Sequence, residues 1–496
     1  MRKILFRSFV CCLTLVLLLP QLLGCTALFL ETTEAWHFEG EDDSWTFGYG
    51  VRPILSDGEG LYMAGYHNDW VGSGYLDRKQ LSTYADGSSR EFRPDPDYAE
   101  AKAVWMDAGE GGVLLIGIDC IALASTVVQQ IQDRLFTLCA ENNCVSVQIY
   151  ATHCHALPDT LGLWGPVGID GKNDSYMDAL VTAAVSAAKQ AFAAPMTGTL
   201  HYGKAQTEGL LYDSRDPQIY DDTLYQLRFA PVQKDEDGVR LLFYGAHAES
   251  MRGDNTLFSR DFPGVLCDVV EQETGDLALY VPGAIGGLIY TTDLSGAEEF
   301  DAVVNMERTG VALAEYALSI TPADEVVIPP TLSAATTTFT APMDNPLYLY
   351  LKFLGVLDNA VIAGDSETGY LVESSLSVLQ LGELTIACLP GEIFPELVYG
   401  GEAAQYGTGG ENPPTLSEIA AGYGVGELLV IGLCNDELGY IVPPSDFLVH
   451  PDTPYLTTIR DETGENHYEE TNSLGPATAQ VIAEAFATAL AEMQAS

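Results

Sequence analysis

Basic residues are scarce in this 496-residue sequence, which has 22 lysines and arginines against 70 aspartates and glutamates and a formal net charge of −48. A surface with such an excess of negative charge repels nucleic acid and anionic lipid headgroups, so we expect no nucleic-acid partner. The charge suits a protein that acts on neutral or cationic material, or one that must stay soluble in a saline environment. An apolar content of 47% excludes general disorder.

The cysteines lack the pattern of a disulfide framework or of a structural zinc site. Seven of them lie beyond Cys25, an odd and scattered set, and none has C-x-x-C spacing. Most lie in apolar segments such as residues 384–389, where cysteine behaves as a small hydrophobic residue. A pairing of Cys139 with Cys144 across a short loop stays open.

Long apolar runs are absent except at the N-terminus, where three basic residues precede an apolar stretch and a small-residue site that ends in Cys25. This pattern resembles a bacterial lipoprotein signal, with residues 1–24 as the signal peptide and Cys25 as the lipid-bearing residue. An uncleaved anchor is the alternative, because the apolar stretch continues to Leu30. Both predict an exported protein held on the extracytoplasmic face of the cell membrane, with residues 25–45 as an acidic tether and residues 46–496 as the body.

Short apolar segments alternate with longer amphipathic segments in the body of the chain. We predict strands at residues 113–118, 145–150, 241–245, 277–281, 376–389 and 428–434, and helices at 126–139, 176–192, 262–273 and 477–493. This order is typical of an α/β fold with mixed β-sheets and flanking helices. Ligands of such sheets bind beyond the carboxyl ends of strands. The Pro- and Thr-rich segment 322–340 is expected to mark a lobe boundary.

Two of the eight histidines, His153 and His155, lie one residue apart just after the strand predicted at 145–150. In an extended backbone, residues i and i+2 project to the same side, so both imidazoles can face one pocket while Cys154 points away. Imidazole is the commonest metal ligand and titrates near neutral pH, so one ring can bind a metal while the other handles a proton. A surface or packing role for the pair is the alternative.

Polar residues also follow other predicted strands: His247 with Glu249, Glu392, and Tyr440. Two histidines and a carboxylate, with an open position for water, form a ligand set that suits catalytic zinc. Zinc lowers the pKa of bound water toward ~7 and polarises a carbonyl oxygen, which serves amide or ester hydrolysis.

Several short motifs resemble, in the same order, those of the neutral, non-lysosomal ceramidase family. They are M-A-G-Y at 63–66, A-T-H-C-H at 151–155, Y-G-A-H-A-E-S-M at 244–251, S-R-D-F-P-G at 259–264, L-P-G-E at 389–392, N-D-E-L-G-Y at 435–440, and H-Y-E with L-G-P within 467–476. Their collinear order is more specific than any single motif. The resemblance implies a ceramidase-like catalytic domain, without the family's C-terminal immunoglobulin-like domain.

Carried onto the matching positions, the family pattern implies one zinc ion with four ligands: His153, His247, Glu392 and Tyr440. It also implies that His155 polarises the amide or moves protons, and that Tyr468 stabilises the developing oxyanion. Arg215 is a looser match and would face the site. A solvated arginine in an acidic loop is the alternative for Arg215.

The sequence departs from the family pattern beside these ligands. Ile289 occupies the position of a serine that has been proposed as the nucleophile, so we expect water to be the attacking group. Glu249 replaces a threonine two residues from His247. It either acts as a general base, supports a ligand through a hydrogen bond, or is simply solvated.

These features predict a membrane-tethered, zinc-dependent amidohydrolase in which zinc-activated water cleaves the N-acyl bond of ceramide or a related N-acyl lipid. A lipid-anchored enzyme would share a surface with such a substrate. The alternative is a ceramidase-like lipoprotein that binds a lipid or another ligand without cleaving it, which would suit the loss of the serine. An unrelated solute-binding lipoprotein is a third option.

Overall fold

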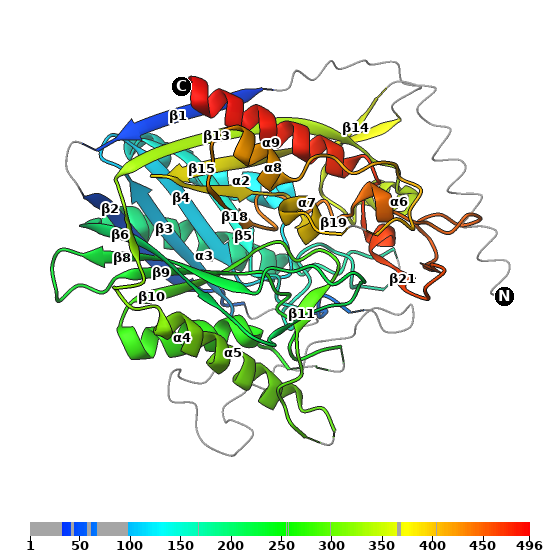
Figure 1. The fold of residues 1–496 in the computed structure, drawn as a ribbon, viewed down its shortest axis with the longest axis horizontal. Coiled ribbons are helices and arrows are strands. Elements are labelled where there is room, and N and C mark those ends of the chain that lie inside the picture. The colour runs from blue at the N-terminus through cyan, green and yellow to red at the C-terminus, as the bar shows by residue number, and fades with distance from the viewer. Residues whose placement is uncertain are drawn as a thin grey trace.

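Two β-sheets pack face to face, and helices cover the outer face of each, so the molecule has four layers (Figure 1). This computed structural model describes residues 32–40, 44–56, 61–66, 98–166, 168–253, 255, 257–297, 299–364, 369–402 and 404–496. The signal peptide predicted at residues 1–24 and the lipid-bearing Cys25 lie outside the described residues. Within the described part of the chain, no helix combines the length and apolar character that a membrane span needs.

The larger sheet has nine strands. Their order is β10 (Leu277–Pro282), β9 (Val239–Tyr244), β8 (Thr223–Pro231), β6 (Met196–Gln206), β2 (Trp45–Pro53), β3 (Glu100–Asp107), β4 (Gly112–Ile118) and β5 (Cys144–Ala151), with β12 (Val326–Ile328) beside β6. The pairs β9–β10 and β4–β5 are parallel, whereas the remaining neighbours are antiparallel. The sheet is therefore mixed, as expected.

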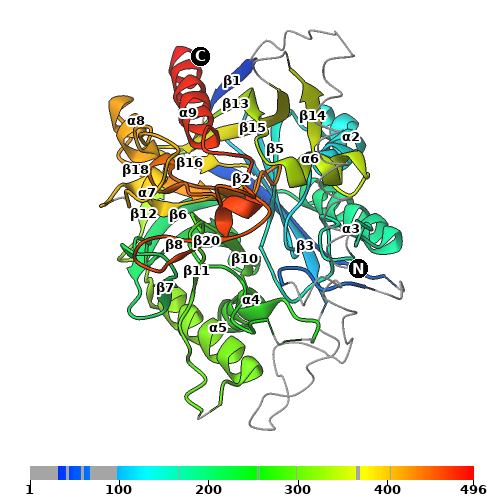
Figure 2. The same ribbon diagram turned by 90° about the vertical axis from the view of Figure 1, so that its right-hand side faces the viewer.

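Helices cover the outer face of this sheet in two groups: α2 (Ser125–Glu141) with α3 (Asp174–Ala193), and α4 (Asp261–Thr274) with α5 (Ala302–Ser319) (Figure 2). The alanine-rich face of α3 lies unusually close to β2. A Cβ atom at Gly48 would overlap the carbonyl oxygen of Ala191, and one at Gly50 would overlap that of Ala187. Small residues on both elements thus allow the helix to sit against the backbone of the strand.

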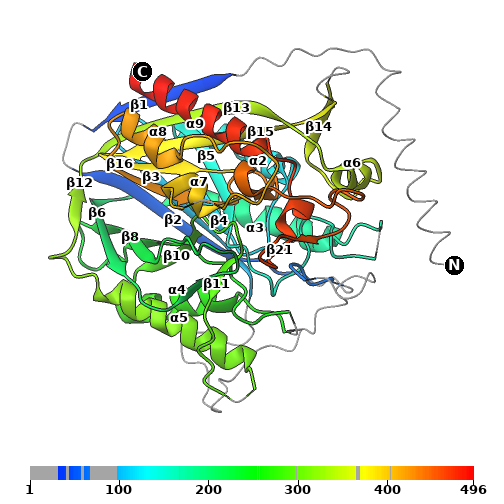
Figure 3. The same cartoon turned by 45° about the vertical axis from the view of Figure 1, so that its right-hand side comes forward.

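The smaller sheet has six strands. Their order is β1 (Thr33–Glu39), β13 (Thr331–Pro342), β15 (Tyr370–Leu381), β16 (Leu384–Cys388) and β18 (Glu427–Ile431), with β14 (Ala360–Ala363) beside β15. The C-terminal helix α9 (Thr478–Ala495) lies along β13 and β15, and α7 (Pro395–Tyr399) and α8 (Leu416–Gly422) continue this layer (Figure 3). Further short elements include α6 (Pro346–Phe353), β7 (Leu211–Asp213), β11 (Ile289–Thr291), β20 (Ile459–Arg460) and β21 (Asn466–His467).

An apolar core fills the space between the two sheets. Phe47 of β2 and Phe229 of β8 stack with their ring centroids 4.2 Å apart, and both belong to the same buried cluster as Leu379, Leu381 and Ile386 of the smaller sheet. Because both sheets contribute to this layer, the burial of apolar surface holds them together.

Three sequence-based expectations are wrong. The strand expected at 376–389 is two strands, β15 and β16, joined by a tight turn in which Gly382 has φ +58°. The segment 322–340 is not a lobe boundary, since most of it forms β12 and the central strand β13. Residues 25–45 do not form a free tether throughout, because Thr33–Glu39 pairs along β13 as an edge strand.

The predicted helices and the other predicted strands are present, with ends that differ by a few residues. Cys139 and Cys144, whose pairing the sequence left open, are both free thiols.

Asn435 joins the two sheets at the carboxyl end of β5. Its amide N–H donates to the carbonyl of Ile149 at 2.7 Å, and its side-chain Oδ1 accepts from the amide N–H of Ile149 at 2.9 Å. Its Nδ2 donates to Oε1 of Gln148 at 2.6 Å. The residue has φ +68°, a conformation that asparagine tolerates better than most residues do. The segment after β18 is thereby fixed against β5.

We predict that Asn435→Ala lowers the free energy of unfolding by roughly 2–4 kcal/mol, because it leaves buried polar groups unpaired and places alanine in a strained conformation. Urea unfolding followed by circular dichroism measures the change. Asn466→Ala, at an exposed position, is the control and should change the free energy by less than about 0.5 kcal/mol. An Asn435→Ala protein as stable as the control would show that this joint contributes little.

Candidate metal centre

Residues that follow strands of both sheets meet at one end of the molecule. His153 follows β5 and His247 follows β9 of the larger sheet, whereas Glu392 follows β16 and Tyr440 follows β18 of the smaller one. Glu392 and Tyr440 begin two short parallel strands, β17 (Glu392–Ile393) and β19 (Tyr440–Ile441), in which they lie opposite each other. The four predicted ligands thus lie beyond the carboxyl ends of strands, where α/β sheets bind their ligands.

His153 and His155 face the same point, although the backbone between β5 and His155 is not extended. His153 has φ +60°, in the left-handed region, so the expected extended geometry is wrong. The Nε2 atoms of the two rings are nevertheless 3.2 Å apart. Cys154 points away from them, as predicted, and its thiol lies 3.1 Å from the carbonyl oxygen of Ser259. An amide hydrogen bond from His155 to the carbonyl of Ala248 links this turn to the segment that carries His247.

Backbone carbonyls fix the ring orientation of two histidines. Nδ1–H of His153 donates to the carbonyl of Ile121 at 2.8 Å, and Nδ1–H of His247 donates to the carbonyl of Ile289 at 3.0 Å. In the neutral rings, Nε2 therefore carries a lone pair. This arrangement is typical of histidines that bind metals, because the bond on one nitrogen sets the tautomer and leaves the other nitrogen free.

These two Nε2 atoms converge on one carboxylate oxygen. Oε2 of Glu392 lies 2.9 Å from Nε2 of His247 and 3.4 Å from Nε2 of His153. All three residues are buried, and the nearest ring nitrogens of His153, His155 and His247 lie within 4.8 Å of one another. Lone pairs on nitrogen and oxygen repel one another at this distance unless a proton or a cation lies between them.

Burial and neighbouring charges shift the pKa values of His155, His247 and Glu392 in different directions. Burial lowers the pKa of His155 well below its usual value, and the neighbouring histidines add to the effect. Burial also opposes the charged form of His247, but the hydrogen bond and negative charge of Glu392 outweigh it and raise the pKa of His247. Burial alone would raise the pKa of Glu392, yet His153 and His247 more than offset it, so this pKa is lowered. Glu392 is therefore an anion, and His155 is neutral.

This donor set fits a divalent cation. His153, His247 and Glu392 present two imidazole nitrogens and a carboxylate oxygen to one place, and Nε2 of His155 is close enough to be either a further ligand or a catalytic neighbour. The ring of Tyr440 stacks on His247 with centroids 6.5 Å apart, and its hydroxyl lies 3.0 Å from that of Tyr468. Burial raises the pKa of Tyr440 well above its usual value, so the hydroxyl stays protonated without a cation.

The cluster opens into a cavity of about 380 Å³. Its walls include His153, His155, Glu392, Tyr440 and Tyr468, together with apolar and aromatic residues, among them Leu161, Leu163, Trp164, Leu288 and Tyr348. None of the described residues that line it is a serine, threonine or cysteine. A side-chain nucleophile of these types is therefore missing from the described wall.

The loop that contains Leu288 and Ile289 supports a histidine ring. Ile289 begins β11, with a buried side chain and a carbonyl that accepts from both Nδ1–H and the amide N–H of His247. Leu288, with φ +58°, is the residue of this loop that borders the cavity.

Glu249 is buried beside the cluster, so the possibility that it is simply solvated is wrong. It is 8% exposed, and its Oε2 accepts a hydrogen bond of 2.6 Å from the hydroxyl of Tyr66. The same oxygen lies 3.6 Å from Nδ1 of His155. Tyr66 belongs to the M-A-G-Y motif, which contributed to the family resemblance but was given no role and no place near the site. The preceding residue, Gly65, has φ +92°, and any side chain there would overlap the ring of His155.

Arg215 is neither a solvated arginine nor part of the cavity wall, and both expectations for it are wrong. It is 4% exposed and forms ion pairs with Asp446, Glu469 and Glu470, while its guanidinium lies 5.3 Å from the ring centroid of Phe394. Glu469 and Glu470 directly follow Tyr468 in the chain. Arg215 therefore holds the turn that directly follows Tyr468 in the chain.

We predict that Arg215→Met lowers the free energy of unfolding by about 3–5 kcal/mol, because it leaves three buried carboxyl groups without their cation. Thermal unfolding followed by calorimetry checks this. Arg134→Met removes an exposed arginine of α2 and should have an effect within about 0.5 kcal/mol. Equal stability of the two variants would mean that the ion cluster does not stabilise the fold.

Comparison with solved structures identifies the fold. The chain superposes on the neutral ceramidase from Pseudomonas aeruginosa with a TM-score of 0.66 and 15% sequence identity, over 92% of this chain and 75% of that one. A ceramidase complexed with C2 gives a TM-score of 0.64 and 15% identity, over 92% and 76% of the two chains. No protein-family model and no curated protein sequence matches the chain. The expected mixed α/β fold is confirmed: this chain has the fold of the neutral ceramidases, in a form that is divergent in sequence.

Proposed function

We propose that the protein is a zinc-dependent amidohydrolase that cleaves the N-acyl bond of ceramide or of a related N-acyl lipid. The observation that carries the proposal is the convergence of Nε2 of His153 and Nε2 of His247 on Oε2 of Glu392, with both Nδ1 atoms held by backbone carbonyls. The likeness in fold to solved ceramidases supports amide hydrolysis over other metal-dependent reactions.

His153, His247 and Glu392 would hold the ion, with Tyr440 as the fourth ligand. Imidazole donors favour zinc over magnesium or calcium, which prefer sites built from oxygen atoms alone. When bound, zinc acts as a Lewis acid and lowers the pKa of a water molecule toward ~7.

The residues around the cluster have separate roles in the proposed reaction. Water attacks the amide carbon, since the described cavity wall holds no serine, threonine or cysteine. The hydroxyl of Tyr468 donates a hydrogen bond to the carbonyl oxygen as negative charge develops there. Glu249, held by Tyr66, accepts the proton of the attacking water directly or through His155, and this proton then passes to the leaving amine.

We also propose that the enzyme works on the extracytoplasmic face of the cell membrane, tethered by a lipid on Cys25. The basic start, the apolar stretch and the cysteine after a small residue support this location. A lipid tether keeps the enzyme close to substrates that partition into the same bilayer.

Ligand binding without hydrolysis is the second candidate, favoured by the lack of a side-chain nucleophile in the described wall. The two candidates differ in one measurement. Incubation of the zinc-loaded protein with a panel of ceramides and N-acyl amino acids, followed by mass spectrometry, should detect free fatty acid. Saturable binding of the same compounds without any release of fatty acid would favour the binding protein.

We predict about one zinc ion per chain, measured by elemental analysis of the purified protein after dialysis against buffered zinc. His153→Ala and His247→Ala should each lose most of this zinc, because each removes one imidazole ligand. His37→Ala is the matched control: His37 lies in β1, bonded to Ser333, and its loss should leave the zinc content unchanged. Full zinc content in both site variants would refute the ligand assignment.

We predict that Glu249→Gln lowers kcat for amide hydrolysis by about 10²- to 10⁴-fold while the zinc content stays at the wild-type level, since the amide keeps the shape of the side chain but cannot accept the proton. Tyr66→Phe should have a smaller effect in the same direction, because it only releases Glu249 from its hydrogen bond. Glu462→Gln, at an exposed position, controls for loss of charge. Wild-type turnover in Glu249→Gln would exclude Glu249 from proton transfer.

A further inference from the structure

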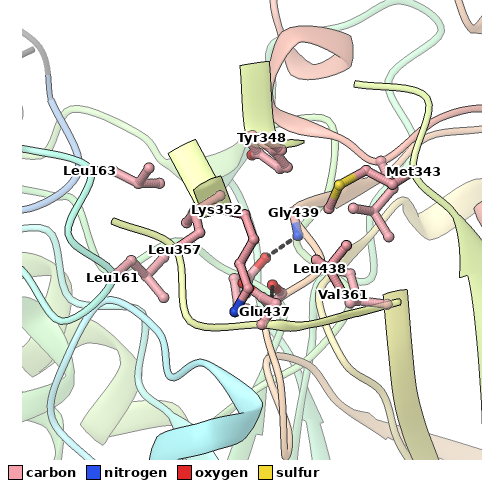
Figure 4. Close-up of a pocket in the computed structure, with 12 residues that line it drawn as sticks. Leu161, Leu163, Met343, Tyr348, Lys352, Leu357, Val361, Glu437, Leu438 and Gly439 are labelled. Atoms are coloured by element: carbon pink, nitrogen blue, oxygen red, sulfur yellow. Dashed lines mark hydrogen bonds between the residues drawn. The ribbon is translucent and has the colours of Figure 1, made fainter. Parts of the chain in front are cut away.

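A second, smaller cavity of about 30 Å³ adjoins the one that contains the metal centre. The two share a wall made of Leu161, Leu163, Tyr348, Glu437 and Gly439. The rest of the small cavity is mostly apolar, with Met343, Leu357, Val361, Leu438 and Leu474 around it (Figure 4). Two ionisable side chains, Glu437 and Lys352, extend into these apolar surroundings (Figure 4).

Glu437 has one carboxyl oxygen paired and one unpaired. Its Oε1 accepts from the amide N–H of Gly439 at 2.7 Å, whereas its buried Oε2 has no hydrogen-bond partner. Asn359 borders the same cavity, but its Nδ2 donates its hydrogen bonds to Asp436 and to the carbonyl of Glu437 instead of to Oε2. A buried polar atom without a partner is costly, so Oε2 is poised to pair with a ligand that enters the cavity.

The state of the two ionisable groups indicates what that ligand must offer. Burial raises the pKa of Glu437 well above its usual value, and in its protonated form the side chain has an O–H to donate. Lys352, in the last turn of α6, is a donor as well, and no ion pair links it to any residue in the described part of the chain. Both groups therefore call for an acceptor oxygen.

We infer that Glu437 and Lys352 form an anchor for an acceptor oxygen on the acyl chain of the substrate, remote from the bond that is cleaved. The inference rests on the proposed amidohydrolase function and narrows its substrates to amides whose acyl chain carries a hydroxyl, keto or carboxylate group. The leucine, methionine and valine side chains around the anchor suit the methylene groups that lead to such an oxygen. A plain alkyl chain would leave the buried Oε2 of Glu437 unpaired, and a site built to hydrogen-bond an oxygen discriminates against analogues that lack it.

The test uses p-nitroanilides of matched acyl chains of about six to ten carbons that end in a methyl, a hydroxyl or a carboxylate group. For the wild-type protein, kcat/KM should be at least about tenfold higher for an oxygen-bearing chain than for the methyl-ended chain of equal length, mostly through KM. Glu437→Leu should abolish this preference, and Glu437→Gln should keep most of it, because glutamine can still donate. A preference that persists in Glu437→Leu would overturn the inference, as would its absence in the wild type.

Lys352→Met separates the two kinds of acceptor. It should remove the advantage of the carboxylate chain and keep that of the hydroxyl chain, because only the anion needs the ammonium group. Lys189→Met, which removes an exposed lysine of α3, should leave every ratio unchanged. Thermal melting and zinc content confirm that each variant is folded and loaded.

Binding of the corresponding free acids, measured by calorimetry on the zinc-loaded protein, tests the anchor without turnover. Tighter binding of the oxygen-bearing acids by the wild type, lost in Glu437→Leu, supports the anchor even if no amide is hydrolysed. Equal binding of all the acids by both proteins overturns the anchor and leaves the proposed hydrolysis standing.

Discussion

The negative charge of Glu392 is the constraint on which the site depends. It is buried between two imidazoles whose Nδ1–H groups point to backbone carbonyls, so the Nε2 atom of each ring is the one that faces the carboxylate. A buried charge is tolerated only when it is paired. The protein therefore creates a place where a cation is stabilised by all three groups, and the orientation of each ring is set by atoms outside the cluster. The carbonyl of Ile289 has this role for His247.

Residues around the cluster hold the groups that we propose to transfer protons and to select the substrate. Tyr66 holds Glu249 beside His155, and Arg215 holds the turn after Tyr468, so two catalytic candidates are fixed by contacts that do not touch the substrate. Glu437 differs from these residues, because one of its carboxyl oxygens is bonded to the amide of Gly439 while the other has no hydrogen-bond partner in the described structure. In the proposed function, the satisfied polar groups surround the reacting bond, and the unsatisfied oxygen of Glu437 marks the place for a further ligand group.

Much of this arrangement could be predicted from the sequence, for identifiable reasons. Strands that are buried on both faces, such as β4 and β10, read as continuous apolar runs, and His153, His247 and Glu392 come just after such runs. The Thr-rich strand β13 and the edge strand β1 carry weak apolar signals, so the sequence predicts a boundary and a tether at these positions. Ile121 and Ile289 accept hydrogen bonds from the two histidines through their backbone carbonyls. Every residue type has such a carbonyl, so the sequence could not predict these roles. Arg215 was misjudged because its three acidic partners lie more than two hundred residues away in sequence.

The division of the ligands between the sheets has a consequence for the whole molecule. His153 and His247 follow strands of the larger sheet, whereas Glu392 and Tyr440 follow strands of the smaller one and pair with each other in β17 and β19. An ion held by all four residues would cross-link two layers of the fold. Because these residues are far apart in sequence, the cross-link would close long loops of the chain. Binding of the ion and the contact between the two sheets would then stabilise each other. Any motion that separates the sheets would also separate the ligands of the ion.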